Sequence, residues 1–375
     1  MASVTLAAMR PTSCIVDLKA IEKNVRTLKE RAAPTPICAV VKADGYGHGA
    51  VQSAEAAIAG GASWLAVAIV EEGIELRNAG ITVPILVLSE PPSAGLEACV
   101  AHNLTCTVYS SEGLEAISAA ATAASKVVDI HLDVDSGMTR VGVQLDEIAD
   151  FVASAKNYPN LSLTAVWTHC PVADEPDNPF TATQLDKLGA AIREQAPGLQ
   201  VHVANSATLL TGQAAAAGEP MMVRPGISLY GIDPDEALTG MIDVQPALTL
   251  RSEVSWVKSV PPGVGVGYGH RWTTDRETTI ATVPIGYADG LRRDLGLKGG
   301  SVLIGGKRHP IVGVVTMDQI MVDVGPDSTV ARGDEVILIG SQGDEQITAE
   351  EMAKILGTIP YELVCAISKR VPRTY

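Results

Sequence analysis

A chain of 375 residues is long enough for a large hydrophobic core and for two domains. With 46% hydrophobic and only 4% aromatic residues, it excludes a disordered protein and predicts layers packed mainly through Val, Ile, Leu and Ala. A formal net charge of −15 argues against nucleic acid or an anionic membrane as partner, because such binding requires clustered Lys and Arg, and it favours a small-molecule ligand.

The cysteines predict neither a metal centre nor a disulfide framework. They are scattered without a Cys-x-x-Cys pair, at Cys14, Cys38, Cys99, Cys106, Cys170 and Cys365. The N-terminal MASVTLAAMR puts its apolar run ahead of its first basic residue, the reverse of a secretory signal, and no later apolar run has membrane-spanning length. We therefore expect a cytoplasmic protein with reduced thiols, no metal and no membrane partner.

Apolar runs typical of strands alternate with helical patterns through the N-terminal part of the chain. The expected strands are 37–42, 64–69, 84–88, 105–109, 127–134, 161–168, 200–204 and 221–224. Between them, apolar residues recur at spacings of three and four in segments such as 71–78, 112–124, 145–155 and 182–195. Eight such units in about 220 residues fit a (β/α)₈ TIM-like barrel with a parallel sheet better than an open doubly wound sheet.

The pattern changes beyond Pro246. Gly, Pro and Asp separate the apolar runs 248–260, 279–284, 308–315, 320–324 and 335–339, with few helical patterns between them. We expect an α/β protein in which a barrel of residues 11–242 precedes a mostly β C-terminal domain of residues 243–375, beside which residues 1–10 could pack.

A lysine ends the first expected strand, in the stretch AVVKADGYGHGA at residues 39–50. Lysine is among the residues least often fully buried, so Lys42 is either a side chain that carries its ammonium to water or an amine held for chemistry. Taken alone, the following DGYGHG is compatible with a flexible surface turn. It is not a P-loop, because GxxxxGK[ST] is absent.

Two later strands end in residues suited to bind an anion. A TIM-like barrel has its active site at the carboxyl ends of the strands and often binds phosphate after strands seven and eight. Strand seven ends at Asn205 and Ser206, and strand eight continues into Arg-Pro-Gly-Ile at 224–227, which supplies backbone N–H groups at a helix start. A phosphate seat and Lys42 on one rim suggest a cofactor that carries a phosphate and is held through its aldehyde as a Schiff base. Pyridoxal 5′-phosphate (PLP) meets both demands.

A series of motifs resembles the signatures of the alanine racemase family. In chain order they are VVKADGYGHG, DSGMTRVGV, WTHC, ANSAT, VRPGISLYG, VGYG, PIGYADG, VTMDQ and PYE, and they extend over residues 11–375. The family is a PLP-dependent homodimer with an N-terminal barrel and a C-terminal β domain, which agrees with the architecture expected above. The resemblance implies an isomerase that interconverts L-alanine and D-alanine.

The resemblance assigns two opposed bases. It makes Lys42 the Schiff-base lysine and one base, and the partner subunit's Tyr268 the other, so that the homodimer is obligatory for activity. Two bases are needed because a proton leaves one face of a planar carbanion and returns to the other. Desolvation favours the neutral form of Lys42. A phenol has an ordinary pKa of about 10, and nearby positive charge or hydrogen-bond donors must lower this pKa before the group can act as a base. His169 resembles the histidine that contacts Tyr268 and the cofactor ring. Without the motifs, it would be a satisfied core histidine and Tyr268 a strand aromatic.

Further matches concern the cofactor and the substrate. Arg224 resembles the arginine at the pyridine nitrogen; a guanidinium only donates and stays charged, which disfavours a proton on that nitrogen and favours racemisation over transamination. Arg140 matches the arginine that binds the substrate carboxylate, and Met317 from the partner would add a backbone N–H. Asp318 and Tyr287 match residues that line the entrance, although both also fit ordinary turns. The remaining cofactor contacts are assigned to Tyr46, Asn205, Ser206, Gly226, Ile227 and Tyr361.

One position departs from the family. Where many members have a lysine that becomes carbamylated and orients the arginine, this chain has Asp133, seven residues before Arg140. Since an aspartate carries negative charge without modification, we expect Asp133 to replace the carbamate, with activity independent of bicarbonate. Otherwise it is an ordinary strand carboxylate. Pro360 and Lys369 are lesser departures at the rim of the pocket.

Alternatives to an alanine racemase stay open. A racemase that prefers serine or accepts several amino acids would need only a slightly larger rim, although Tyr361 favours a small pocket. A barrel-type PLP decarboxylase is disfavoured by the paired bases and by Arg224. A non-catalytic PLP carrier is disfavoured because such barrel proteins usually lack a β domain, and Tyr268 lies in one.

Overall fold

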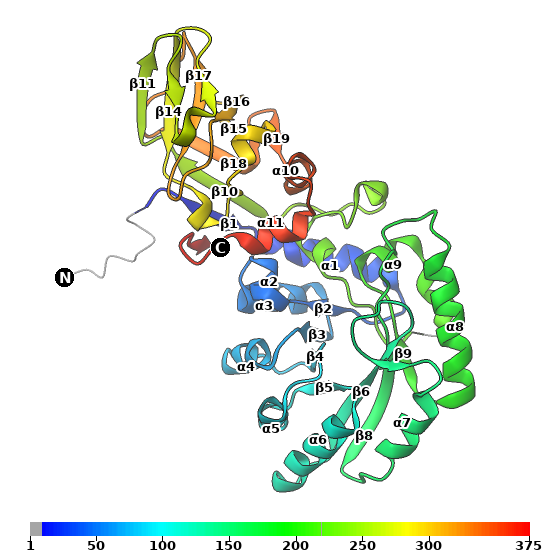
Figure 1. Cartoon of the computed structure of the whole chain (residues 1–375). Helices are drawn as coiled ribbons and strands as arrows, with labels where there is room; N and C mark the ends of the chain where they lie inside the picture. The colour runs from blue at the N-terminus through cyan, green and yellow to red at the C-terminus, as the bar shows by residue number, and fades with distance from the viewer. Residues whose placement is uncertain (1–9, 219) are drawn as a thin grey trace, which may run out of the picture. The chain divides into compact units, whose positions relative to one another are not determined.

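The computed structural model describes residues 10–218 and 220–375 (Figure 1). These residues divide into two compact units, one of residues 19–245 and one of residues 10–18 together with 246–375. The first unit is an α/β barrel, and the second is mostly β.

The barrel unit is built on a curved sheet of parallel strands. The strands follow one another in chain order: β2 (Cys38–Val40), β3 (Trp64–Val67), β4 (Ile85–Val87), β5 (Thr105–Val108), β6 (Val128–Asp135), β8 (Leu161–Trp167) and β9 (Gln200–His202). In the register, Ala39 lies opposite Leu65, and Leu65 opposite Ile85. The short β7 (Val143–Gln144) pairs with β6 beside this path. The strands expected from the apolar runs up to residue 204 are confirmed, although most are shorter.

The sheet closes through a segment that is not a regular strand, where an eighth strand was expected at 221–224. The Arg224 N–H donates to the Ala204 carbonyl, just after β9, at 2.7 Å. On its other side, the segment accepts from β2, because the Cys38 N–H donates to the Val223 carbonyl at 2.8 Å. The segment therefore joins β9 to β2 and completes the barrel. Prolines at both of its ends lack an N–H, which explains why no regular ladder forms.

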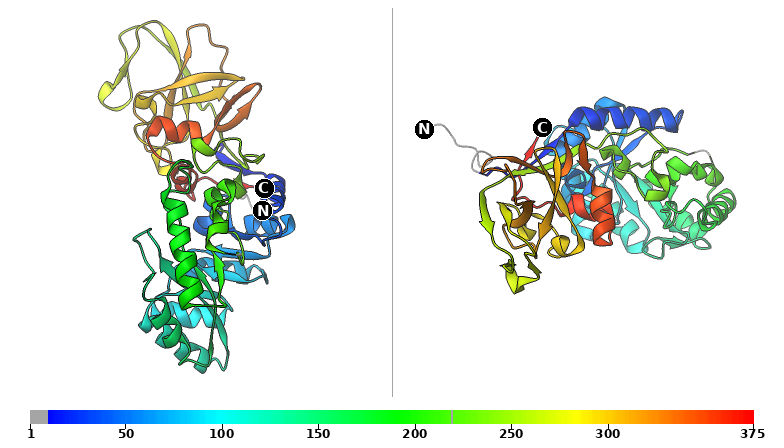
Figure 2. Two further views of the ribbon diagram at one scale, coloured as in Figure 1. Left: turned by 90° about the vertical axis from the view of Figure 1, so that its right-hand side faces the viewer. Right: turned by 90° about the horizontal axis from the view of Figure 1, so that it is seen from above.

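Helices cover the outside of the strands and lie in the loops at the strand ends. They are α1 (Leu18–Ala32), α2 (Lys42–Tyr46), α3 (Ala50–Gly60), α4 (Val70–Asn78), α5 (Ser93–Ala101), α6 (Ser111–Ala123), α7 (Ile148–Ala155), α8 (Phe180–Gln195) and α9 (Ser206–Thr211), with the 3₁₀ helices η2 (Gln213–Ala217), η3 (Ile227–Tyr230) and η4 (Glu236–Leu238). The long α8 runs along the outer side of the strands (Figure 1; Figure 2, left). Local signals set the helix ends: Ser110 caps α6 by accepting from the Gly113 N–H, and Gly61, with φ 104°, ends α3.

The second unit is mostly antiparallel. Its main sheet has the order β11 (Trp256–Val260), β14 (Thr278–Val283), β17 (Ile320–Gly325), β16 (Lys307–Val312), β15 (Ser301–Ile304), β18 (Glu335–Gln342), β10 (Leu248–Glu253), β1 (Ser13–Val16) and β20 (Arg373–Thr374). Beside it, β19 (Glu345–Ile347) pairs with β18, and β12 (Gly265–Val266) forms a hairpin with β13 (Trp272–Thr273). The hairpin packs Val266 and Trp272 against Val312 and Met321. The 3₁₀ helices η5 (Tyr268–His270), η6 (Tyr287–Asp289) and η7 (Leu295–Lys298) lie in loops.

Some features of this unit were not expected from the sequence. β1 pairs antiparallel with β10 and parallel with β20. The run 248–260 is divided between β10 and β11, which lie far apart in the strand order. The helices α10 (Ala349–Leu356) and α11 (Pro360–Ala366) were missed. Their signals were nevertheless present, since Thr348 caps α10 by accepting from the Glu351 N–H at 3.0 Å and Gly357 ends it with φ 73°.

Candidate active site

Lys42 lies at the carboxyl end of β2 and opens α2. The residues after it adopt the left-handed backbone conformation, with φ of 53° at Ala43, 54° at Asp44, 59° at Gly45 and 53° at Tyr46. Residues other than glycine seldom adopt this conformation, and still less often in succession. The stretch after Lys42 is therefore a specific left-handed turn at the mouth of the barrel.

Two side chains within the motif hold this turn. Oδ1 of Asp44 accepts from the Ala50 N–H at 2.9 Å. Nδ1 of His48 lies 3.1 Å from the Gly45 carbonyl oxygen and 2.9 Å from that of Tyr46. Because carbonyl oxygens only accept, Nδ1 carries the proton and donates it. Asp44 and His48, which were not predicted as functional residues, thus fix the shape of the turn.

The Tyr46 side chain reaches from this turn to the predicted phosphate seat. Its ring is buried and lies 5.2 Å from the ring of Tyr230. A Cβ built on Gly226 would lie 2.5 Å from the Tyr46 hydroxyl oxygen. Glycine at 226 therefore permits an approach that a side chain would block. The structure brings Tyr46 and Gly226, which are distant in sequence, directly together.

Ser206 lies at the same seat. The Gly226 N–H donates to Ser206 Oγ at 2.9 Å, which leaves the hydroxyl proton of Ser206 to be donated elsewhere. Ile227 is the first residue of η3, so its N–H has no acceptor within the helix. Asn205 acts as a helix cap, since its Oδ1 accepts from the N–H of Thr208 at 2.8 Å. Hydroxyl groups and an N–H at a helix start are donors suited to a phosphate.

Arg224 lies in the barrel interior and is 4% exposed. Its Nη1 lies 2.7 Å from Nδ1 and 2.6 Å from the carbonyl oxygen of His202, and its Nη2 donates to the Thr168 carbonyl at 2.8 Å. The guanidinium stands over the ring of Trp167, with its central carbon 4.9 Å from the ring centroid. Burial lowers the pKa of Arg224 to about 10, so it stays charged at neutral pH.

A buried pair of histidines lies behind Arg224. A guanidinium has only donors, so Nδ1 of His202 accepts, and its Nε2–H donates to Nδ1 of His131, 2.9 Å away. Burial, assisted by the positive charge of Arg224, lowers the pKa of His131 to about 3 and that of His202 well below its ordinary value. Sequence reasoning missed both residues. The available signal was a histidine within each of two otherwise buried strand runs.

His169 follows β8 at the mouth of the barrel. Burial lowers its pKa to about 3, and the positive charges of Arg224, Arg140 and Lys42 lower it in the same direction. All three charges therefore lie within electrostatic range of the His169 ring. Gln184 of α8, also missed in the sequence, donates to the His169 carbonyl at 2.9 Å. His169 is therefore neutral and fixed through its backbone.

Asp133 is a buried residue of β6 with 3% exposure. Burial raises its pKa to about 7, although the charges of Arg224 and Arg140 act in the opposite direction. Arg140 is exposed, and among the described residues no salt bridge joins it to Asp133. The negative charge expected of Asp133 is therefore complete only above neutral pH.

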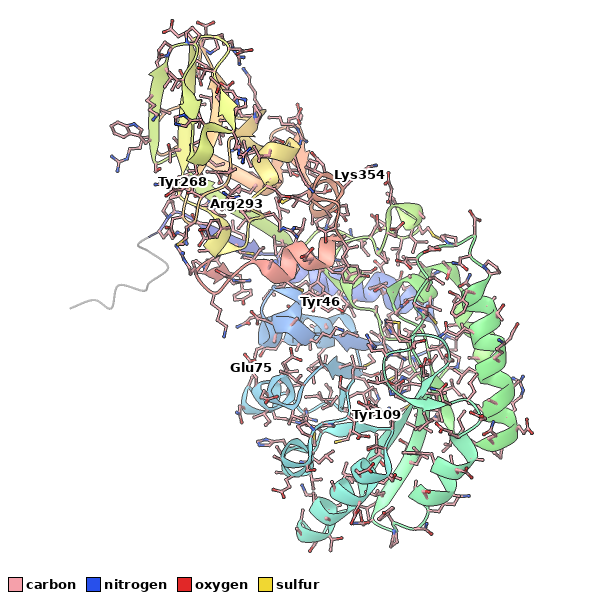
Figure 3. All side chains as sticks on the ribbon, in the orientation of Figure 1. Tyr46, Glu75, Tyr109, Tyr268, Arg293 and Lys354 are labelled. Carbon is pink, nitrogen blue, oxygen red and sulfur yellow. The ribbon has the colours of Figure 1, made fainter. Side chains whose placement is uncertain are left out.

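Tyr268 lies in the second unit, at the start of η5 in the loop of the β12–β13 hairpin. It is flanked by Gly267 and Gly269, both with φ of 70°, and its side chain is 72% exposed (Figure 3). A Cβ on Gly267 would lie 2.8 Å from the Met321 side chain, so the loop packs closely on β17. The structure thus presents the phenol on a well-anchored turn.

Met317, Asp318 and Tyr287 also belong to this unit and lie on paired turns. The Ala288 N–H donates to the Met317 carbonyl at 3.0 Å. The Asp318 carboxylate accepts from Arg370 at 2.7 Å. Met317 is 52% exposed and Tyr287 is 40% exposed. These three predicted residues are therefore brought together within the unit.

Tyr361 is the second residue of α11 and is half-buried. Pro360 occupies the first position of that helix, where its missing N–H costs no intrahelical hydrogen bond. This departure from the family motif is therefore compatible with the local structure. Lys369 is exposed.

No metal centre is formed by the part of the chain that the structure describes, in which no group of three or more His, Cys, Asp or Glu is arranged to hold an ion. Over the same residues, no helix is both long enough and apolar enough to cross a membrane.

The fold and the site together define a two-domain protein, in which a parallel α/β barrel with a lysine, a buried arginine and an anion seat at its mouth precedes a β domain. The family models of the alanine racemase N-terminal domain and C-terminal domain match residues 16–234 and 247–375. The chain belongs to the alanine racemase family.

Individual relatives are similar to this chain over nearly its full length. The alanine racemase of Cutibacterium acnes is 45% identical over 369 residues, which cover 97% of each chain. The crystal structure of the alanine racemase from D-cycloserine-producing Streptomyces lavendulae is 37% identical, with a TM-score of 0.91 over 98% of this chain and 97% of that one. The alanine racemase of Bartonella henselae, solved with covalently bound pyridoxal phosphate, is 29% identical, with a TM-score of 0.88 over 97% of this chain and 99% of that one.

Proposed function

We propose that the protein interconverts L-alanine and D-alanine, with PLP as its cofactor and with Lys42 and Tyr268 as opposed bases. The observation that carries the proposal is the seat at the barrel mouth, where Tyr46 meets Gly226 beside the Ser206 hydroxyl. Membership in the alanine racemase family supports the same activity.

The residues at the barrel mouth fit a phosphorylated pyridine aldehyde. Tyr46, Ser206 and the Ile227 N–H would bind the phosphate, Lys42 would attach the aldehyde, and Arg224 would face the pyridine nitrogen. The Arg224 hydrogen bonds use Nη1 and Nη2, and Nε makes none with the described residues, so one donor stays available. Further proposed contacts are Asn205, His169, Gly226 and Tyr361. When bound, PLP withdraws electrons from the substrate α-carbon and so eases loss of its proton.

Arg224 biases the reaction toward racemisation. His202 and Thr168 fix its orientation, and its pKa of about 10 keeps it charged. A charged group that can only donate disfavours a second proton on the nitrogen that it faces. Electron withdrawal is then limited, and the α-carbon recovers a proton before a side reaction occurs.

Two bases account for the change of configuration. The amine of Lys42 takes the α-proton of one enantiomer, and the phenol of Tyr268 delivers a proton to the opposite face; the roles exchange for the other enantiomer.

We propose that each active site takes Tyr268 and Met317 from the partner subunit of a homodimer. Tyr268, Met317 and Tyr287 are large side chains that are 72%, 52% and 40% exposed in the single chain. Exposed apolar groups gathered on one protein frequently mark an interface. A homodimer would cover them. A cytoplasmic location is also proposed, in keeping with the absence of a disulfide among the described cysteines.

Arg140 and the Met317 backbone N–H would bind the substrate carboxylate, with Asp133 in the place of a carbamylated lysine. The positive charge of Arg140 acts to lower the pKa of Asp133, so the two side chains lie within electrostatic range of each other. Tyr287 and Asp318 are proposed to line the entrance. Activity independent of bicarbonate is the expected consequence. Unchanged kinetics in Asp133→Ala would refute this role.

The activity is tested by incubating the purified protein with L-alanine in deuterated water. The product is expected to contain both enantiomers, with deuterium at the α-carbon. A parallel reaction with L-serine decides substrate preference, because faster conversion of serine would favour the serine racemase. Release of carbon dioxide would instead identify a decarboxylase. The absence of α-exchange with both amino acids would point to a PLP carrier.

A further inference from the structure

Glu72 links the helix that follows β3 to the peptide that follows Lys42. It is the third residue of α4, and its Oε2 accepts from the N–H groups of Ala68 at 2.8 Å and Ile69 at 3.3 Å, which caps the helix. Its Oε1 accepts from the Ala43 N–H at 2.6 Å. One carboxylate therefore joins two neighbouring strand ends.

The Ala43 hydrogen bond lies where the pairing of β2 with β3 ends. The backbone contact before it runs from the Val41 N–H to the Ala66 carbonyl, at 2.9 Å. At Ala43 the left-handed turn begins, and an extended parallel ladder cannot continue through it. Glu72 supplies the acceptor that the next strand no longer provides. The N–H that it binds belongs to the peptide group that also contains the Lys42 carbonyl.

We propose that Glu72 is a positioning residue for Lys42. By holding the Lys42–Ala43 peptide group, it fixes the direction in which the lysine side chain leaves the backbone. It also starts the turn that carries Tyr46 to Gly226. Successive left-handed residues other than glycine persist only where the surroundings hold them, and a charged acceptor at the first of them does so. The inference rests on the proposed function, in which Lys42 attaches PLP.

Glu72→Asp separates the two tasks of the carboxylate. Aspartate keeps a negative charge in the first turn of α4, but it is one methylene shorter and loses the reach to Ala43. Glu72→Gln keeps the length, but only one of its terminal atoms can accept, so either Ala43 or the cap loses its partner. The matched control is Glu75→Asp, one turn further along α4, where the side chain is exposed (Figure 3).

The first measurement is attachment of PLP to the cofactor-free protein. Samples are reduced with borohydride at set times, and the pyridoxyl peptide that contains Lys42 is quantified by mass spectrometry. The rate is expected to be about tenfold lower in Glu72→Asp, as for loss of one charge-assisted hydrogen bond, and unchanged in Glu75→Asp. The unfolding temperature of Glu72→Asp is expected to change by less than about 4 °C, because the negative charge in the first turn of α4 is kept.

The second measurement is amide hydrogen exchange of residues 43–46 in the cofactor-free protein, which does not depend on activity. Faster exchange in Glu72→Asp supports the proposal, and unchanged exchange overturns it. Equal attachment rates in Glu72→Asp and the unmodified protein also overturn it. A slower rate with a large drop in unfolding temperature would assign Glu72 a merely structural role. If the unmodified protein itself forms no adduct at Lys42, the proposed function fails, and the exchange experiment still decides the role of Glu72.

Discussion

The hydroxyl oxygen of Tyr46 lies so close to the backbone of Gly226 that a Cβ at residue 226 would be 2.5 Å from it. Tyr46 ends the turn after Lys42, and Gly226 precedes η3 on the opposite side of the barrel closure. This contact joins the two sequence motifs that a phosphate-bearing cofactor would need together.

Gly226→Ala is expected to weaken PLP binding about tenfold to a hundredfold, because the added methyl group displaces the Tyr46 hydroxyl from the seat. The measurement is equilibrium titration of the cofactor-free protein with PLP. Overall folding is expected to persist, as judged by circular dichroism.

The control is a double-mutant cycle with Tyr46→Phe. Removal of the hydroxyl relieves the closest contact, so Gly226→Ala should cost less in the Tyr46→Phe background than in the unmodified protein. Strictly additive losses would show that the two residues do not share one site.

The raised pKa of Asp133 predicts a pH-dependent affinity for the substrate carboxylate. Asp133 is protonated below about pH 7 and ionised above it, and only the ionised form can orient Arg140. The KM for L-alanine is therefore expected to fall as pH rises through 7, with up to about a tenfold change for each pH unit below the pKa. Steady-state kinetics between pH 6 and 9 measure this directly.

Asp133→Asn provides the matched control, since it keeps the shape and removes the titration. Its KM should be high and nearly independent of pH in this range. A pH profile that is the same in Asp133→Asn and in the unmodified chain would contradict the assignment.

Histidines with lowered pKa values predict that the cofactor-free protein loses stability in mild acid. The pKa values of His131 and His169 are lowered to about 3, and that of His202 is lowered too, so below about pH 6.5 the unfolded chain binds protons that the folded chain does not. Each histidine then lowers the free energy of unfolding by up to about 1.4 kcal/mol per pH unit. Asp133 and Asp174 act in the opposite direction, because their raised pKa values add stability as pH falls through them, but the lowered pKa of His309 adds to the effect of the other three histidines.

Urea unfolding between pH 5 and 6.5 tests whether the free energy of unfolding falls as the pH falls. His131→Phe removes one titrating group and should reduce the slope of stability against pH. An unchanged slope in that variant, or greater stability at pH 5 than at pH 6.5, would contradict the account.

Much of the fold could be predicted from local pattern alone. The runs at β2, β3 and β4 are continuously apolar, as is typical of parallel strands buried on both faces. The closing segment, residues 221–224, was harder to predict. The prolines at its ends cannot donate the hydrogen bonds of a regular ladder, and its pairing partners, β9 and β2, lie far away in sequence. β1 has only four residues, and its place beside β10 and β20 depends on contacts that no local signal encodes.

The site likewise has residues that local pattern predicts and features that it does not predict. Lys42, Arg224 and Ser206 stand at strand ends, where barrel geometry predicts chemistry. Three features could not be predicted: the left-handed turn after Lys42, the His202–His131 pair behind Arg224, and the carboxylate of Glu72 on Ala43. The last two depend on residues from separate elements that meet only after folding, and the turn depends on successive left-handed residues other than glycine, which no local pattern predicts.

The central claim is that Lys42 of one subunit and Tyr268 of the other act on the same substrate, and mixing two inactive variants tests it most directly. Lys42→Ala and Tyr268→Phe are purified separately, unfolded or dissociated together, and reassembled. Since half of the random dimers are mixed and each mixed dimer has one intact site, about a quarter of the normal racemase activity is expected to return. If the mixture stays as inactive as either variant, although mixed dimers form, the two residues do not share a site across the subunits and the account is wrong.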